Sequence, residues 1–319
     1  MDHRTVGRER RTVTGSSGFL SGALLLLWLA PVMAPASSLY RWQDADGRWH
    51  FSDRVPEQQQ VDDLSERYRQ PDAPDIRIET RDYALSPALR QRLELSITRI
   101  FAIYRQALAV SPATDTPFDI LLYGDAEAYR AYARATAPQL ENPAGFFNGQ
   151  TGRITALALP DHDALLRLIT HECSHAISAT QGGYVPIWLN EGLAEYFSQL
   201  QLYGMAADVP VADHWLRQLR QQPLAPDTLR RTINAAPRDW QAAAGNGYSY
   251  AVSWSLVWFL MDSAEGRTLL RALLARVADD PRPLMHSAEF IDHHWPGGFS
   301  ALEQAWRQWL PRAHGRHRY

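Results

Sequence analysis

The run H-E-C-S-H at residues 171–175 constrains this chain more than any other feature. On a helix, side chains four residues apart lie one above the other on the same face. The rings of His171 and His175 can therefore close on a single zinc ion, a metal that imidazole nitrogens bind well. Zinc acidifies water, and Glu172 between the two histidines can accept the proton that such a water loses. The spacing thus predicts a zinc site with its own general base.

The residues around this run predict a continuous helix and a second helix that returns to it. Apolar residues recur at helical spacing over 165–177, Asp161 or Asp163 can begin the helix, and Gly182-Gly183 ends it. After a proline-containing turn comes W-L-N-E-G-L-A-E-Y-F, which carries Glu191. A His2Glu set would leave one zinc position open, as catalytic zinc requires. The alternative is an amphipathic helix with solvated histidines.

H-E-x-x-H followed by W-L-x-E-G-x-A resembles the gluzincin zinc metallopeptidases, the superfamily of thermolysin and aminopeptidase N. The similarity is greatest to their bacterial peptidase-MA-like domains and extends over roughly residues 75–280. The resemblance implies that His171, His175 and Glu191 bind zinc and that Glu172 is the general base.

The resemblance also implies roles for residues around the metal. Glu195, one turn after Glu191, is expected to hold the second ring nitrogen of a ligand histidine, and Asn190 is expected beside the ligands. In gluzincins a tyrosine at the start of a later helix stabilises the oxyanion. Tyr250 matches that position best and Tyr248 is the second candidate. The alternative is a tyrosine that only packs at a helix terminus.

Residues 144–159 lie just before the histidine helix. We expect a turn at 145–149 and then a strand at 153–159. The resemblance implies that this strand is the sheet edge with which an extended peptide substrate pairs, and an internal strand is the alternative. Aminopeptidases of the superfamily carry Gly-x-Met-Glu-Asn, which this chain lacks, so an endopeptidase is favoured over an aminopeptidase.

Charge and cysteine content argue against a nucleic-acid partner and against a disulfide. The net charge is −3 and no basic cluster alternates with aromatic residues, which argues against a nucleic-acid partner. The single cysteine, Cys173, excludes an intramolecular disulfide. On the predicted helix it faces away from the two histidines, so we expect it to be a packing residue.

The first residues have the pattern of a signal peptide. Arginines at positions 8, 10 and 11 precede an apolar run at 19–33, and Ala34-Pro35-Ala36 offers a cleavage site. We expect residues 1–36 to be removed and the protein to be periplasmic or secreted. An uncleaved membrane anchor is the alternative.

Residues 37–55 predict a β-hairpin with a turn at Asp44–Gly47, and 56–75 predict a linker. The hairpin pattern resembles a small module of unknown function found behind bacterial signal peptides. A single hairpin is marginally stable, so it is expected to pack on the main domain or on an envelope partner.

The sequence therefore predicts an α+β, zincin-like domain over residues 76–280, with an upstream β-sheet and a mostly helical C-terminal half. A helical extension and a basic tail, which includes His314 and His317, follow at 281–319; we expect this tail to fray. The other expected elements are strands at 76–80 and 118–123 and helices at 87–108, 125–136, 252–261, 263–279 and 299–310.

The predicted function is zinc-dependent hydrolysis of peptide bonds in the cell envelope, with a peptide or protein as substrate. One alternative is a non-catalytic zinc protein that binds peptide or assembles a partner complex. Another is an amidase that acts on cell-wall peptides through the same residues.

Overall fold

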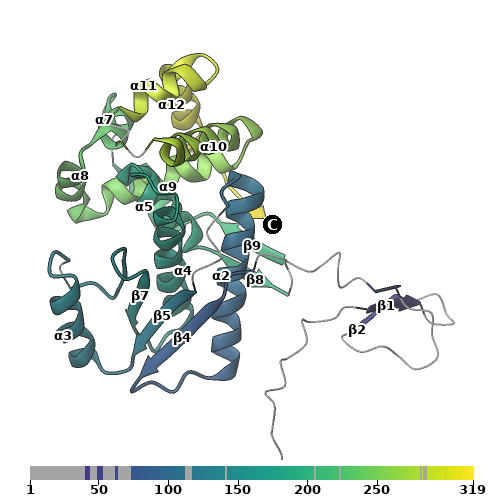
Figure 1. Ribbon diagram of the computed structural model, residues 1–319. Coiled ribbons are helices and arrows are strands. Elements are labelled where there is room, and N and C mark those ends of the chain that lie inside the picture. Colours follow the sequence, from purple (N-terminus) through teal and green to yellow (C-terminus); the bar gives the residue numbers. More distant parts are fainter. Residues whose placement is uncertain are drawn as a thin grey trace, which may run out of the picture. The chain divides into compact units, whose positions relative to one another are not determined.

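The structure is a computed structural model that describes residues 73–111, 117–140, 142–204, 206–222, 224–280, 282 and 286–319, together with three short strands before them (Figure 1). The chain divides into two compact units, Met1–Gln70 and Pro71–Tyr319. The predicted signal segment at 1–36 and the predicted turn at 44–47 lie outside the described residues.

The first unit contains a small antiparallel sheet. Strand β1 (Tyr40–Gln43) pairs with β2 (Trp49–Ser52), which is the predicted hairpin. Strand β3 (Asp62–Asp63) pairs with the other edge of β1, so residues from the predicted linker form part of this sheet.

The second unit begins with a four-stranded sheet in the order β4-β5-β7-β6. Strands β4 (Ile76–Arg81), β5 (Phe118–Tyr123) and β7 (Arg153–Leu157) are parallel, and β6 (Gly145–Asn148) is antiparallel to β7 at the edge. The expected strand at 153–159 is thus internal, and the segment expected to be a turn forms the edge. A four-residue strand that begins with glycine gives too weak an alternation to be recognised from sequence alone.

Helices cover both faces of this sheet (Figure 1). Ile120 and Leu122 of β5 point to the face with α2 (Pro87–Leu108) and α4 (His162–Ala179). Leu121 and Tyr123 alternate to the opposite face, where they meet α3 (Ala126–Thr136). Helices α2 and α3 begin where the sequence predicts. Ser86 and Asp125 cap them, because each side-chain oxygen accepts a hydrogen bond from a free backbone N–H of the first turn.

The C-terminal half is built around α9 (Tyr248–Met261), which is buried on nearly all sides. Helix α5 (Ile187–Phe197) packs closely along it, and Gly192 explains how. A β-carbon at Gly192 would lie 2.7 Å from the Ser253 carbonyl oxygen and from a Val257 methyl group, so the two backbones approach to a distance that only glycine permits. The remaining helices are α6 (Asp213–Gln221), α7 (Thr228–Asn234), α8 (Pro237–Ala243), η1 (Ala244–Asn246), α10 (Ala264–Asp279), α11 (Ser287–His294) and α12 (Gly298–Trp309).

A second sheet in this half was not predicted. Strands β8 (Gln201–Tyr203) and β9 (Ala206–Pro210) form a hairpin, and β10 (Arg316–Arg318) pairs with β9. The expectation of a frayed tail is therefore wrong: the last residues form a strand, and the hydroxyl groups of Tyr196 and Tyr319 lie 2.6 Å apart. His293 and His294 lie in the last turn of α11, where each ring meets a backbone carbonyl one turn earlier.

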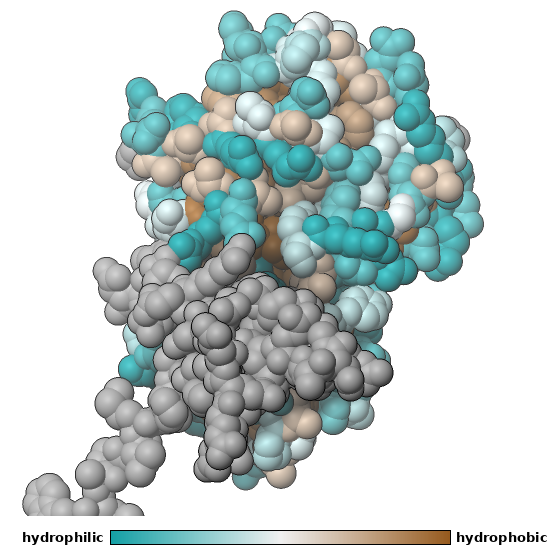
Figure 2. All heavy atoms as spheres, turned by 90° about the vertical axis from the view of Figure 1, so that its right-hand side faces the viewer, coloured by the Kyte–Doolittle hydropathy of each residue, from teal (hydrophilic) through white to brown (hydrophobic). Residues whose placement is uncertain are grey.

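The α+β class, with an upstream sheet and a mostly helical C-terminal half, is confirmed. Figure 2 shows a face on which hydrophilic side chains dominate and apolar ones appear in small, separate areas. Among the helices of the described residues, none has both the length and the apolar character needed to cross a bilayer.

The buried terminus predicts an acid-sensitive stability. His317 stacks on Trp258 with ring centroids 4.0 Å apart, and burial lowers the pKa of His317 to about 4. An unfolded histidine titrates near pH 6.5, so the folded chain binds fewer protons between about pH 6.5 and 4. The resulting stability is complete above this window and is lost as the pH falls through it.

This contribution is tested by urea unfolding of the metal-free protein at pH 7 and pH 5. The difference between the two unfolding free energies should be smaller in His317→Gln, which cannot be protonated. An equal pH dependence in both proteins would contradict the assignment to His317.

Candidate metal centre

The two histidines of the motif lie on α4, one turn apart. Asp161 caps this helix by accepting a hydrogen bond from the Asp163 backbone N–H, as one of the two predicted starts requires. Cys173 lies on the opposite face in the core, fully buried, as expected for a packing residue. The helix therefore has one apolar face in the core and presents His171 and His175 on the other.

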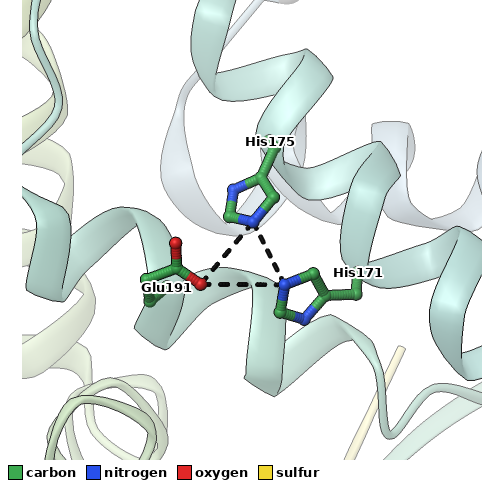
Figure 3. Close-up of side chains that lie close together, drawn as sticks. All are labelled: His171, His175 and Glu191. Carbon is green, nitrogen blue, oxygen red and sulfur yellow. Dashed lines mark hydrogen bonds and ion pairs between the residues drawn. The ribbon is translucent and has the colours of Figure 1, made fainter. Parts of the chain in front are cut away.

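The close-up in Figure 3 shows His171 and His175 from α4 and Glu191 from α5 turned toward one another. The two Nε2 atoms are 3.1 Å apart. The nearer carboxylate oxygen of Glu191, Oε2, lies 3.7 Å from Nε2 of His171 and 3.6 Å from Nε2 of His175. Of the described residues, these three form the group of side chains that could hold a metal ion.

The donor set and its dimensions fit zinc. Tetrahedral zinc with bonds of about 2.0–2.1 Å places its ligand atoms roughly 3.3–3.4 Å apart, and the three measured separations lie close to this value. Two imidazoles and one carboxylate are also the ligand types of a catalytic zinc site with one open position. His171, His175 and Glu191 would hold the ion.

A carboxylate supports the outer side of this cluster. Oε1 of Glu195 lies 3.4 Å from Nδ1 of His171, which fixes the tautomer that leaves Nε2 of His171 free for a metal. The indole N–H of Trp215 donates a hydrogen bond of 2.8 Å to the other oxygen, Oε2, of Glu195. Trp215 thus holds Glu195, and Glu195 holds His171.

The pKa values of the cluster are displaced in opposite directions. Burial lowers the pKa of His171, but the hydrogen bond with Glu195 and the surrounding carboxylates outweigh it and raise that pKa to about 9. Burial and the neighbouring His171 lower the pKa of His175 to about 4. Burial raises the pKa of Glu191 to about 7. Burial also acts to raise the pKa of Glu195, but hydrogen bonds from His171 and Trp215 leave it below its ordinary value.

Glu172 is buried on the same helix and is held from the sheet. The backbone N–H of Phe147, in edge strand β6, donates a hydrogen bond of 2.9 Å to Oε2 of Glu172. Alternate residues of an antiparallel edge strand direct their backbone groups away from the sheet. The Leu157 N–H donates a hydrogen bond to the Ala144 carbonyl, so Ala144 faces β7. The next residue, Gly145, and then Phe147 therefore direct their backbone N–H and C=O groups away from β7. The free edge of β6 therefore lies beside Glu172.

The two candidate tyrosines differ in position. Both lie in the first turn of α9, but Tyr250 lines the cleft of the metal cluster and Tyr248 is not among the residues that line it. Burial, followed by the charges of Glu191 and Glu195, raises the pKa of the Tyr250 phenol, so Tyr250 keeps its proton at neutral pH. Tyr250 is thus the better placed of the two as a hydrogen-bond donor.

The cleft has a volume of about 490 Å³, room for several residues of a peptide. Apolar side chains line it beside the polar cluster. Leu140 and Tyr184 are each 40% exposed, which is unusual among the large apolar residues that the structure describes, and both belong to the cleft wall. Asn190, which was expected beside the ligands, also lines it.

The hydrogen bond from Trp215 predicts an effect on zinc affinity. In Trp215→Phe the ring remains but the N–H that holds Glu195 is lost, so His171 is less well oriented. We expect the Kd for zinc to rise about tenfold. Competition with a zinc-binding dye measures the Kd, and thermal unfolding of the metal-free protein checks the fold. An unchanged Kd would show that Trp215 only fills space.

Sequence reasoning did not find Phe147 and Trp215. Phe147 acts through its backbone, which no side-chain pattern reveals. Trp215 is twenty residues from Glu195 and reaches it only because α6 packs against α9. The glycine at position 247 is the one weak signal in the sequence. In the structure its φ is +77°, and a β-carbon there would lie 2.7 Å from the Trp215 ring, so the indole fits closely against it.

Comparison with known proteins identifies only the N-terminal part. A domain of unknown function, DUF4124, matches residues 25–75, which contain β1, β2 and β3. This agrees with the small module of unknown function expected around the hairpin. No curated protein matches the chain. The match ends before β4, so it does not reach the metal cluster.

Proposed function

We propose that the protein is a zinc-dependent endopeptidase of the bacterial cell envelope, of the gluzincin type. The observation that carries the proposal is that Glu172 lies in the same cleft as the His171–His175–Glu191 cluster and is bound by the edge strand. Zinc held by these three side chains would supply Lewis-acid chemistry: it would polarise a carbonyl group and acidify water.

Residues of the chain can bind the substrate, transfer the proton and stabilise the oxyanion. The free edge of β6 can pair with an extended peptide through backbone hydrogen bonds, which hold any sequence in register. Glu172 can accept a proton from water and pass it to the leaving amine. Tyr250 can donate a hydrogen bond to the developing oxyanion, a contribution of about 3–4 kcal/mol in comparable sites.

The envelope location rests on the signal-like pattern at 1–36. The match to DUF4124 begins at residue 25 and so overlaps the end of that segment, and we propose that this module contacts an envelope partner.

The test is a measurement of zinc content together with cleavage of a mixed peptide library, with and without a chelator. The proposal expects about one zinc per chain and cleavage that the chelator abolishes and added zinc restores. Zinc binding without cleavage would favour the non-catalytic alternative. A folded protein that binds no zinc would overturn the proposal.

A further inference from the structure

A second cavity adjoins the metal cleft. It has a volume of about 180 Å³, enough for a small polar side chain with some water. Leu140 and Pro143 line both this cavity and the metal cleft, so the two share that wall. Its other lining residues are Tyr129, Arg130, Ala133, Arg134 and Asn142.

Two arginines give this cavity a positive charge. Arg130 and Arg134 lie one turn apart on α3, and both are exposed. The ion pairs and side-chain hydrogen bonds found in the described part of the chain include neither of them. Like charges four residues apart on a helix repel each other by a few tenths of a kcal/mol, and an anion between them removes that cost.

Tyr129, one of the residues that line the cavity, carries a buried polar group without a partner among the described residues. Tyr129 is only 2% exposed, and its hydroxyl has no hydrogen-bond partner within the described residues. A buried hydroxyl without a partner is rare in folded proteins and marks a place where water or a ligand is expected.

The direction of a bound peptide connects the two cavities. A peptide paired with the free edge of β6 would run past Gly145, and the chain before Gly145 is the segment that contains Pro143. A side chain on that end of the peptide would reach α3, which packs against β5 and β7 (Figure 1). Guanidinium groups bind carboxylates through paired hydrogen bonds, and neutral side chains gain little from them.

We propose that this cavity is a substrate subsite that binds a carboxylate, and that Arg130 and Arg134 select peptides with an acidic group at one fixed position. The proposal rests on the peptide-binding cleft of the proposed function. It adds a substrate class: peptides with a glutamate or aspartate side chain, or a free C-terminal carboxylate, on the Gly145 side of the cleft.

The experiment measures peptide binding separately from cleavage. Zinc-loaded Glu172→Gln protein is titrated with short fluorescent peptides that are blocked at both ends. Each peptide carries one glutamate, moved through every position of a neutral sequence, and has a matched glutamine peptide. A third set carries a free C-terminal carboxylate in place of the glutamate.

At one position, the glutamate peptide is expected to bind about tenfold more tightly than the glutamine peptide. Adding Arg130→Gln and Arg134→Gln should reduce this preference to less than about twofold. The matched control, Arg238→Gln with Arg318→Gln, removes two exposed charges from α8 and β10 and should keep the preference. A preference confined to the free-acid peptides would assign the subsite to the substrate's terminal carboxylate.

Equal binding of glutamate and glutamine peptides at every position would overturn the subsite. A preference for glutamate that survives the loss of both arginines would also overturn it. A preference of equal size at all positions would do the same, because it indicates a general electrostatic attraction to the protein. Cleavage by the wild-type protein without any acidic preference would overturn the subsite and leave the peptidase intact. Position-specific binding without cleavage would overturn the peptidase and leave the subsite.

Discussion

Glu172→Gln is expected to reduce peptide cleavage by about 10²–10⁴-fold with no loss of bound zinc. The amide has the size of the carboxylate, and its oxygen can still accept the hydrogen bond from the Phe147 N–H, which is 2.9 Å long in the native protein. It cannot accept a proton from water. Turnover of a library-selected peptide and zinc content per chain measure the two effects.

The matched control is Glu289→Gln, which removes a carboxylate from α11, a helix that does not line the cleft. It should leave turnover within about twofold of wild type, because exposed changes far from a site rarely affect it. Glu172→Gln protein that cleaves at the wild-type rate would show that Glu172 is not the general base. Loss of zinc in that variant would instead assign Glu172 a role in holding the metal site together.

His175→Ala is expected to abolish tight zinc binding, the second large effect. With one of three ligands missing, only His171 and Glu191 remain, and they cannot complete a catalytic zinc site. Zinc should therefore stop raising the melting temperature. At a free zinc concentration one hundred times the Kd, the wild-type protein should gain about 2.7 kcal/mol, and the variant almost none. Thermal unfolding with zinc and with chelator measures this difference.

His293→Ala is the control for this prediction, since His293 is an exposed histidine at the end of α11. Its zinc-dependent stabilisation should equal that of the wild type. Equal stabilisation of His175→Ala would show that zinc binds elsewhere. Acid should weaken zinc binding in the wild type, because a proton on either ligand histidine must leave before zinc can bind.

Several local predictions agree with the structure, although the turn expected at 145–149 is strand β6. The caps Ser86 and Asp125 begin α2 and α3 where expected, because a cap depends on the few residues that follow it. The four-residue spacing placed His171 and His175 side by side, since helical geometry alone fixes that distance. The edge strand expected at 153–159 is internal instead, because strand order depends on segments far away in the sequence.

The sequence by itself therefore determined the two histidines, the glutamate between them and the helix that carries them, since short-range geometry decides all of these. Only the tertiary structure decided which backbone N–H holds Glu172, that Trp215 supports Glu195, and that the C-terminal residues pair with β9. Each of these contacts joins residues twenty or more positions apart. They form because burial of the common core brings the elements together, and no local pattern encodes that arrangement.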